Sequence, residues 1–373
     1  MTPVRGLTWD HPRGLASLRA AAALHADRLE IEWEAQPLEG FESTPIAELA
    51  RDYDLIVLDH PHLGEAVAGG SLVPVDELLG ADQLELIERG TIGRAAESYR
   101  YAGRLYALPL DAATQVQALQ PALLGDHPAP ASWDDVLALP AALPLALSLA
   151  GPHALLTFFS ICAGLSPGRL ASSAEAPVPP ALGLAALELL ARLAARSERS
   201  LAGANPIGLL EAMARCEAAC CPLVYGYVTY AMPGADPEPL RFCDAPGLGS
   251  TLGGTGIAIT RRCPLTAALA SHLAWLLSAT TQRTFIPQHA GQPSARAAWG
   301  DRAVDEAAGG FYSGTRETIE AAWVRPRFDG YIGFQLRASQ LIRDGLEERT
   351  PHARLFAGLT ELWRAALPAG AEL

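Results

Sequence analysis

The segment from Tyr53 to Gly64, with the sequence YDLIVLDHPHLG, constrains the fold more than any other part of the chain. Its apolar run from Leu55 to Leu58 is too short for an ordinary helix. Such a run is typical of a strand that helices cover on both faces, as in a parallel sheet. Asp59, His60 and His62 follow this strand directly. Because ligands bind at the carboxyl ends of strands in open α/β sheets, the segment predicts a small-molecule site.

Strand-like and helical segments alternate before this strand. Val4 to Trp9 and Leu29 to Trp33 favour strands, whereas Arg13 to His25 and Pro45 to Arg51 favour helices. A strand–helix alternation of this kind predicts parallel strands joined by right-handed crossovers.

The rest of the chain continues the mixture of strands and helices. We expect a hairpin within Glu97 to Asp111, strands over Leu145 to Leu149 and Leu223 to Tyr230, and a strand after Gly253-Gly254. We expect a capped helix from Ser132 and a helix after Gly151. Further helices are expected over Leu63 to Ala68, Leu182 to Arg196, Pro264 to Leu277 and Glu347 to Leu367.

Length and charge restrict the partners. A chain of 373 residues suggests two domains, and we expect a monomer. The net charge of -13 and the lack of a Lys/Arg cluster argue against nucleic acid and against an anionic membrane surface. The stretch from Val136 to Gly168 has no charged residue, but Pro140, Pro144 and Pro152 divide it into pieces too short to cross a bilayer. We therefore expect no membrane insertion.

The amino terminus and the cysteines indicate a compartment. The apolar run from Leu15 to Leu24 is interrupted by Arg19 and does not look like a secretory signal. As written, the chain is expected in the cytoplasm, or in the periplasm or outside the cell if Met1 is not the native start. The cysteines lack the paired CxxC spacing of zinc sites and are interpreted as small buried side chains in a reducing compartment. They are Cys162, Cys216, Cys220, Cys221, Cys243 and Cys263.

The order of several segments resembles the extracellular solute-binding proteins of ABC importers, of the carbohydrate-binding family 1 type. These segments are YDLIVLDHPHLGEAVAGGSLVPVDELL, YRYAGRLYALPLD with LQPALL, PASWDDVLAL, GGTGIAIT and PLTAALASHLAWLLSATTQRTF, and they span nearly the whole chain. The resemblance implies an α/β, periplasmic-binding-protein-like (type II) fold in which two lobes close around a ligand. Lobe 1 would comprise residues 1–110 and about 256–310, and lobe 2 residues 111–255 and about 311–373. The implied partners are a small-molecule ligand and an ABC permease.

The chain departs from the family in two places. As written, its amino terminus is not expected to act as an export signal, and it has CCPLVYGYVTY where sugar binders often carry a tryptophan-bearing turn.

Two groups of polar and ring-bearing residues end the first and third predicted strands, so we expect them at one edge of the sheet. A tryptophan ring can stack on an apolar ligand face while carboxylates and imidazoles bind its polar edge. The alternative is that the acidic residues only cap helices. The histidines with Asp59 are also candidates for a metal site, although we expect no metal. The residues are Trp9, Asp10, His11, Asp59, His60 and His62.

Other candidate ligand contacts lie farther along the chain, each beside a structural alternative. A carboxylate after the first crossing could accept hydrogen bonds from a ligand, and a histidine at a helix amino terminus could favour an anion, or each could serve in local capping. Two tyrosines two residues apart would share a strand face or pack beneath a helix. The glycine pair lacks phosphate-loop spacing and is better explained by close backbone approach. An arginine near a tryptophan could clamp a carboxylate or phosphate, or simply lie at the surface. These residues are Asp111, His153, Tyr225, Tyr227, Gly253, Gly254, Trp323 and Arg325.

The sequence favours a non-catalytic binder of a small polar metabolite, with a carbohydrate as one candidate, no cofactor and no catalytic residue. The alternative is a cytoplasmic enzyme on the same two-lobed scaffold, with Cys162, Cys220 or Cys221 as nucleophile and His60, His62 or Asp111 as base. A regulatory protein that signals through its closed form is a third hypothesis. Fold alone does not decide among them.

Overall fold

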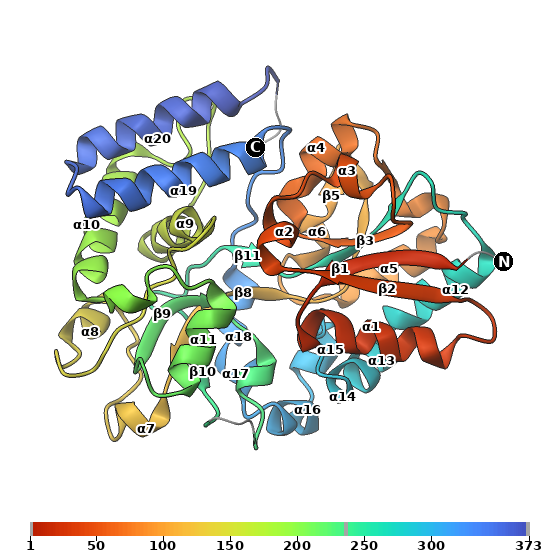
Figure 1. Cartoon of the computed structure of the whole chain (residues 1–373), viewed down its shortest axis with the longest axis horizontal. Helices are drawn as coiled ribbons and strands as arrows, with labels where there is room; N and C mark the ends of the chain where they lie inside the picture. Colours follow the sequence, from red (N-terminus) through yellow and green to blue (C-terminus); the bar gives the residue numbers. More distant parts are fainter. Residues whose placement is uncertain (1–2, 235–237, 371–373) are drawn as a thin grey trace. The chain divides into compact units, whose positions relative to one another are not determined.

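The computed structural model describes residues 3–234 and 238–370, so Met1 and the last residues of the predicted second lobe lie outside the described part. The chain divides into two compact units (Figure 1). Unit 1 comprises Met1–Ala113, Gly253–Glu306 and Arg327–Asp329. Unit 2 comprises Thr114–Leu252, Ala307–Pro326 and Gly330–Leu373.

Unit 1 is built on a six-stranded sheet of order β2-β1-β3-β12-β4, with β7 also paired to β12. Strands β2 (Ile31–Gln36) and β3 (Leu55–Leu58) both run parallel to β1 (Val4–Trp9). The predicted parallel pairing is therefore confirmed. Figure 1 shows α1 (Pro12–Leu24) on one side of these strands, and α2 (Leu38–Ser43), α3 (Ile46–Leu49) and α4 (Leu63–Ala68) on the other, as expected for a strand buried along its whole length.

Strand β12 (Gly256–Thr260) returns to this sheet from much later in the chain and runs antiparallel to β3. Its first residue, Gly256, pairs with Leu58 at the end of β3 and with Pro109 at the end of β7 (Ala107–Pro109). The carboxyl ends of β1, β3 and β7 therefore lie at the edge of the sheet where β12 begins. We call the residues at this edge the unit 1 rim; they are Asp10, His11, Asp59, His60, Leu110, Asp111, Gly254 and Thr255.

The other elements of unit 1 are short and mostly helical. They are α2 (Leu38–Ser43), α3 (Ile46–Leu49), the 3-10 turn His60–His62, α4 (Leu63–Ala68), β4 (Leu72–Val73), the 3-10 turn Val75–Glu77, α5 (Ala81–Gly90), α6 (Ala95–Ser98), β5 (Arg100–Tyr101), β6 (Arg104–Leu105), α12 (Ala267–Leu276), α13 (Ala279–Arg283), α14 (Phe285–Gln288), α15 (Arg296–Trp299) and α16 (Arg302–Ala307), which extends one residue beyond the unit.

Unit 2 has a four-stranded sheet centred on β8 (Ala113–Leu119), which pairs with β9 (Cys220–Tyr225), β10 (Arg241–Cys243) and β11 (Leu252–Gly253). Its core is organised by α9 (His153–Leu165), a helix without charged side chains that is buried over most of its length. Helix α9 packs against α10 (Pro180–Arg196) and α19 (Tyr331–Glu347), and both of these helices pack against α20 (His352–Ala366). The burial of α9 explains why the uncharged stretch of the sequence is so apolar.

The remaining elements of unit 2 surround this sheet and helix. They are α7 (Pro121–Leu124), α8 (Trp133–Ala138), α10 (Pro180–Arg196), the 3-10 turn Arg199–Leu201, α11 (Pro206–Ala214), β9 (Cys220–Tyr225), the 3-10 turn Val228–Tyr230, β10 (Arg241–Cys243), β11 (Leu252–Gly253), α17 (Phe311–Gly314), α18 (Arg316–Ala321), α19 (Tyr331–Glu347) and α20 (His352–Ala366).

Several local predictions are confirmed. The hairpin after Glu97 forms as β5 and β6, and α9 begins after Gly151. Helix α8 has the expected capping box, in which Ser132 Oγ accepts from Asp135 N–H at 3.2 Å and the Asp135 carboxylate accepts from Ser132 N–H at 2.9 Å. Among the described helices, none combines the length and the apolar character needed to cross a bilayer.

Three predicted elements are wrong. The strand over Leu223 to Tyr230 starts earlier, at Cys220, and ends at Tyr225. The strand over Leu145 to Leu149 is reduced to single bridges at Leu145, which pairs with Ser197 and Cys220. The helix over Glu347 to Leu367 is the second of two helices, because α19 ends at Glu347 and α20 begins at His352.

Candidate functional site

The rim of unit 1 is organised by a buried ion pair between Arg13 and Asp111. Arg13 Nε and Nη2 donate to Asp111 Oδ2 at 2.9 and 2.8 Å, and both side chains are about 5 % exposed or less. The backbone N–H of Thr255 donates to Asp111 Oδ1 at 2.7 Å. Burial raises the pKa of the Asp111 carboxyl, and the Arg13 guanidinium opposes this shift. The carboxylate therefore joins the start of α1, the end of β7 and the start of β12.

Gly254 allows the two backbone segments of this rim to approach each other. It has a φ of +93°, and a Cβ at this position would lie 2.7 Å from the carbonyl oxygen of Asp111. Both the positive φ and the lack of space require glycine. The expected close backbone approach at the glycine pair is confirmed for Gly254. Gly253 lies one residue earlier, buried at the end of β11.

The three candidates after β1 have different environments. The Trp9 ring is 2 % exposed and packs against Phe41 and the backbone of Gly14. Asp10 is exposed. The Nδ1 atom of His11 accepts from the N–H of Arg13 and caps α1. Burial, together with the Arg13 charge, lowers the pKa of His11 to about 4. Trp9 is therefore a core residue of unit 1, and His11 is a neutral helix cap.

The candidates after β3 are also engaged within the unit. Asp59 Oδ1 accepts from His60 N–H at 2.9 Å, and the His60 ring makes an edge contact with Tyr99. His62 Nδ1 lies 2.9 Å from the Glu65 carboxylate. His60 and His62 are both buried, whereas Asp59 is half-buried. The described residues include no group of three or more His, Cys, Asp or Glu that could hold a metal ion.

In unit 2 the structure brings together four residues that lie far apart in the sequence. Tyr225, at the end of β9, has its hydroxyl 3.2 Å from Thr251 Oγ1. The backbone of Thr251 forms a parallel bridge with Trp323. His153, at the start of α9, contacts the Tyr225 ring edge-on. We call Tyr225, Thr251, Trp323 and His153 the unit 2 ring cluster. Tyr225 and Trp323 are half-buried, so neither residue is fully enclosed.

A buried hydroxyl network supports this cluster. Ser160 of α9 donates to Gln115 Oε1 at 2.6 Å, and its oxygen lies 3.0 Å from both the N–H and the Oγ1 atom of Thr251. Gln115 also reaches Thr157, whose hydroxyl donates to the carbonyl of Ser148. The Tyr225 hydroxyl is thus attached to a set of polar groups in the core of unit 2.

Two sequence-based expectations about this region are wrong. Tyr227 does not share a strand face with Tyr225, because β9 ends at Tyr225 and Tyr227 is buried in the next turn, beside Tyr230. Arg325 is not a surface arginine. It is 1 % exposed, and its guanidinium donates to the carbonyl of Leu252 and to Gln335 Oε1. It therefore attaches the end of β11 to α19.

The cysteines do not form a reactive site. Cys162, Cys220 and Cys221 are buried, and burial raises the pKa of all three thiols, that of Cys221 to about 12. A thiolate nucleophile needs the opposite shift. Cys216 is exposed and Cys243 half-buried, so the interpretation of all six cysteines as buried side chains is wrong for these two.

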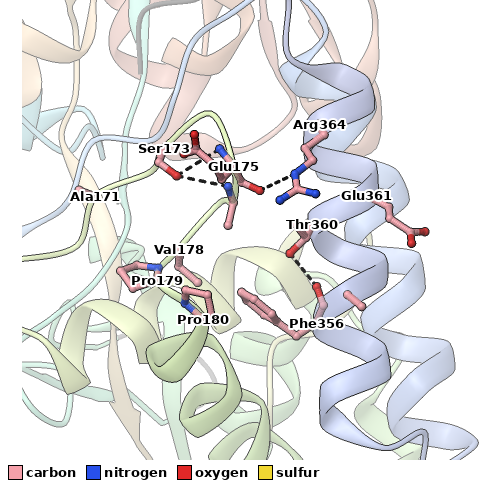
Figure 2. A pocket seen from close by; sticks show the side chains of 12 residues that line it. Ala171, Ser173, Glu175, Val178, Pro179, Pro180, Phe356, Thr360, Glu361 and Arg364 are labelled. Atoms are coloured by element: carbon pink, nitrogen blue, oxygen red, sulfur yellow. Dashed lines mark hydrogen bonds between the residues drawn. The ribbon is translucent and has the colours of Figure 1, made fainter.

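Unit 2 also contains a pocket of about 380 Å³ between the 171–180 loop and α20. Figure 2 shows Val178, Pro179 and Phe356 as its apolar wall, with Arg364 donating to the Glu175 carbonyl. None of the candidate residues from the sequence lines it.

Sequence reasoning missed Arg13, Thr251 and Ser160. A signal did exist for the network of Thr251 and Ser160, because Gln115, like Thr114 and Gln117, places a polar side chain in a strand whose other residues are apolar. A polar side chain in such a strand requires a buried hydrogen-bond partner.

Comparison with known proteins agrees with this architecture. Residues 20–297 match the family model of the bacterial extracellular solute-binding proteins, so the chain belongs to this family. It is a family of solute-binding proteins rather than of enzymes. No curated protein sequence matches the chain.

Solved structures with similar folds cover nearly the whole chain. An ABC transporter solute-binding protein from Agrobacterium radiobacter K84, in complex with ribitol, is 17 % identical with a TM-score of 0.79, over 98 % of both chains. Maltose-bound MalE3 of T. maritima is 16 % identical with a TM-score of 0.77, over 98 % of this chain and 100 % of that one. A Thermotoga lettingae solute-binding protein with α-D-tagatose is 15 % identical with a TM-score of 0.79, over 98 % and 99 %. At these identities the likeness shows the fold, which is the two-lobed α/β fold expected from the sequence.

Proposed function

We propose that this solute-binding protein captures a small polyhydroxylated solute, such as a polyol or a sugar, and presents it to an ABC permease. The family supplies the general activity, and the three similar structures contain ribitol, maltose and α-D-tagatose, which are all neutral and rich in hydroxyl groups.

The observation that carries the solute class is the unit 2 ring cluster. Trp323 and Tyr225 are half-buried, and both lie next to Thr251. The backbone of Trp323 forms a bridge with Thr251, and the Tyr225 hydroxyl lies 3.2 Å from Thr251 Oγ1. A ring face suits the C–H face of a sugar, and a phenol oxygen suits its hydroxyls.

The unit 1 rim is proposed to supply further polar contacts, with the exposed Asp10 and the half-buried Asp59 as the accessible carboxylates.

Isothermal titration calorimetry with ribitol, D-tagatose and maltose tests the proposal. We expect at least one of them to bind the wild-type protein, and Trp323→Ala to weaken that binding about tenfold or more, which corresponds to about 1.4 kcal/mol. Trp275→Ala is the matched control, because Trp275 is also half-buried but packs against His25 and Phe285 in unit 1. Binding that is unchanged in Trp323→Ala, or absent with all three solutes, would contradict the proposal.

A further inference from the structure

The pocket between the 171–180 loop and α20 takes no part in the proposed function. It lies within unit 2, and its volume of about 380 Å³ falls in the range of small-molecule sites. Two side chains of α20 hold the loop in place, because Trp363 Nε1 donates to the carbonyl of Ser173 and Arg364 Nε donates to the carbonyl of Glu175, both at 2.8 Å. The loop wall of the pocket is therefore fixed by hydrogen bonds before any ligand arrives.

Three residues of α20 face the loop and change in character along the helix. Phe356, Thr360 and Arg364 are spaced four positions apart, so they lie on one side of α20, and Figure 2 shows them in a row opposite the loop. Phe356 is 7 % exposed and forms an apolar end with Val178, which is 1 % exposed. The backbone of Arg364 lies about 12 Å farther along the helix axis than that of Phe356. The pocket thus has one apolar end and one charged end.

The guanidinium at the charged end has donors left for a ligand. Arg364 Nε is used by the Glu175 carbonyl, whereas no described residue forms a hydrogen bond or an ion pair with Nη1 or Nη2. Figure 2 shows this guanidinium on the loop side of α20, and the Glu361 carboxylate pointing away from the loop. The two Nη atoms present parallel N–H groups, which match the two oxygens of a carboxylate.

We propose that this pocket is a second ligand site, which binds a monocarboxylate with a short apolar body, the carboxylate on Arg364 and the body against Phe356 and Val178. The guanidinium supplies two donors to the carboxylate, and the apolar end removes the carbon chain from water. The inference goes beyond the proposed function and uses none of its residues. Octanoate represents this class of ligand, because it joins an apolar chain to a single negative charge.

Other ligand classes fit the lining less well. Glu175 and Glu361 also line the pocket, so a dianion such as a phosphate ester would meet additional negative charge. The side-chain hydrogen bond with Ser173 lowers the pKa of Glu175, which is therefore ionised at neutral pH. A polyol is disfavoured as well, because the apolar end offers its hydroxyl groups no hydrogen-bond partner.

Isothermal titration calorimetry of the full-length protein with octanoate and octanamide tests the charge requirement. We expect octanoate to bind with a Kd below about 1 mM, and octanamide, which has the same chain without the charge, to bind about tenfold more weakly or worse. Arg364→Gln should weaken octanoate binding by about tenfold or more and leave octanamide binding unchanged. Arg354→Gln is the matched control, because Arg354 is an exposed arginine of the same helix that does not line the pocket. Equal binding of the two probes to the wild-type protein, or unchanged octanoate binding in Arg364→Gln, would overturn the inference.

NMR of the methyl-labelled wild-type protein locates the site without a substitution in it. Octanoate should shift the signals of the Val178 methyl groups and leave those of Val224, which is buried in β9, unchanged. Thr360→Phe should fill the middle of the pocket and abolish octanoate binding. The Thr360 hydroxyl donates only to the carbonyl of Phe356 in its own helix, so this substitution removes no bond to the loop.

Two results of these titrations count against the site itself. Octanoate that binds without a shift at Val178 lies elsewhere, and this result, like the absence of any octanoate binding, would overturn the inference. No polyol or sugar is present in the titrations, so their outcome does not depend on the proposed function. Failure of the proposed function would appear only in the titrations with ribitol, D-tagatose and maltose.

Discussion

Breaking the ion pair between Arg13 and Asp111 should destabilise unit 1 strongly. Asp111→Asn keeps the size of the side chain but leaves the positive charge of Arg13 without a countercharge at a position that is 5 % exposed. Arg13→Met has the reverse effect and leaves the buried carboxylate unpaired. Removing one partner of a buried pair costs about 3–5 kcal/mol, because the remaining charge cannot be solvated.

For a unit of this size, about 1 kcal/mol lowers Tm by roughly 2–4 °C, so each substitution should lower the Tm of unit 1 by about 6–20 °C. Differential scanning calorimetry gives the transition, and hydrogen–deuterium exchange shows whether the loss is confined to peptides of unit 1. The variant with both substitutions should lose less free energy of unfolding than the sum of the two single losses, by up to about 3 kcal/mol. Arg302→Met, which breaks the exposed pair with Glu306, is the control and should have no measurable effect.

The same experiment separates two roles for Asp111. If each single substitution costs less than about 1 kcal/mol, as at exposed pairs, the reasoning from burial is refuted. If Asp111→Asn instead weakens solute binding at least tenfold with an unchanged Tm, Asp111 is a ligand contact, as the sequence led us to expect.

Two further predictions concern backbone strain and pH. Gly254→Ala should lower the free energy of unfolding by more than about 2 kcal/mol, because of the positive φ and the clash with the Asp111 carbonyl. Gly90→Ala is the control and should not do so, because Gly90 has open space around it. Equal Tm values for the two variants would contradict this prediction. Burial and the neighbouring His25 lower the pKa of His272 to about 4, so below its ordinary value of 6.5 the unfolded chain binds a proton that the folded one does not. The free energy of unfolding should therefore fall as the pH drops from 6.5 to 4, by about 3 kcal/mol from this group. Urea titrations of His272→Gln should show a correspondingly smaller fall. An identical pH dependence in both proteins would disprove the assignment.

The local elements of unit 1 could be predicted because their signals are local. The bounds of β1 match the prediction over Val4 to Trp9, and β3 is the apolar run from Leu55 to Leu58. The strand predicted over Leu223 to Tyr230 failed beyond Tyr225 because three closely spaced tyrosines have high strand propensity, and Gly226, which lies between them, packs too closely against Phe311 and Val116 for a side chain. Propensity does not report such a contact.

The site could be predicted only in part, because its partners are distant in sequence. The rim at the carboxyl ends of β1 and β3 follows from the strand order, but Arg13 reaches Asp111 across 98 positions, and Thr255 reaches it across 144. No spacing in the sequence indicates such a pair. Trp9 was expected to stack on a ligand because it ends a strand, yet its contacts with Gly14 and Phe41 place it in the core.

The two units use their buried polar residues in different ways, and this difference bears on function. In unit 1 the buried side chains of Arg13 and Asp111 form an ion pair with each other, and this ion pair stabilises one conformation of the rim. In unit 2 the buried hydroxyls of Ser160 and Thr251 lie 3.0 Å apart, and the Thr251 hydroxyl lies 3.2 Å from that of Tyr225, a half-buried residue. Cys162 and Cys220 of the same unit are buried, and burial raises the pKa of both thiols, which is unsuited to nucleophilic catalysis. If the unit 2 ring cluster binds the solute as proposed, specificity should depend more on substitutions around Thr251 than on substitutions around Asp111.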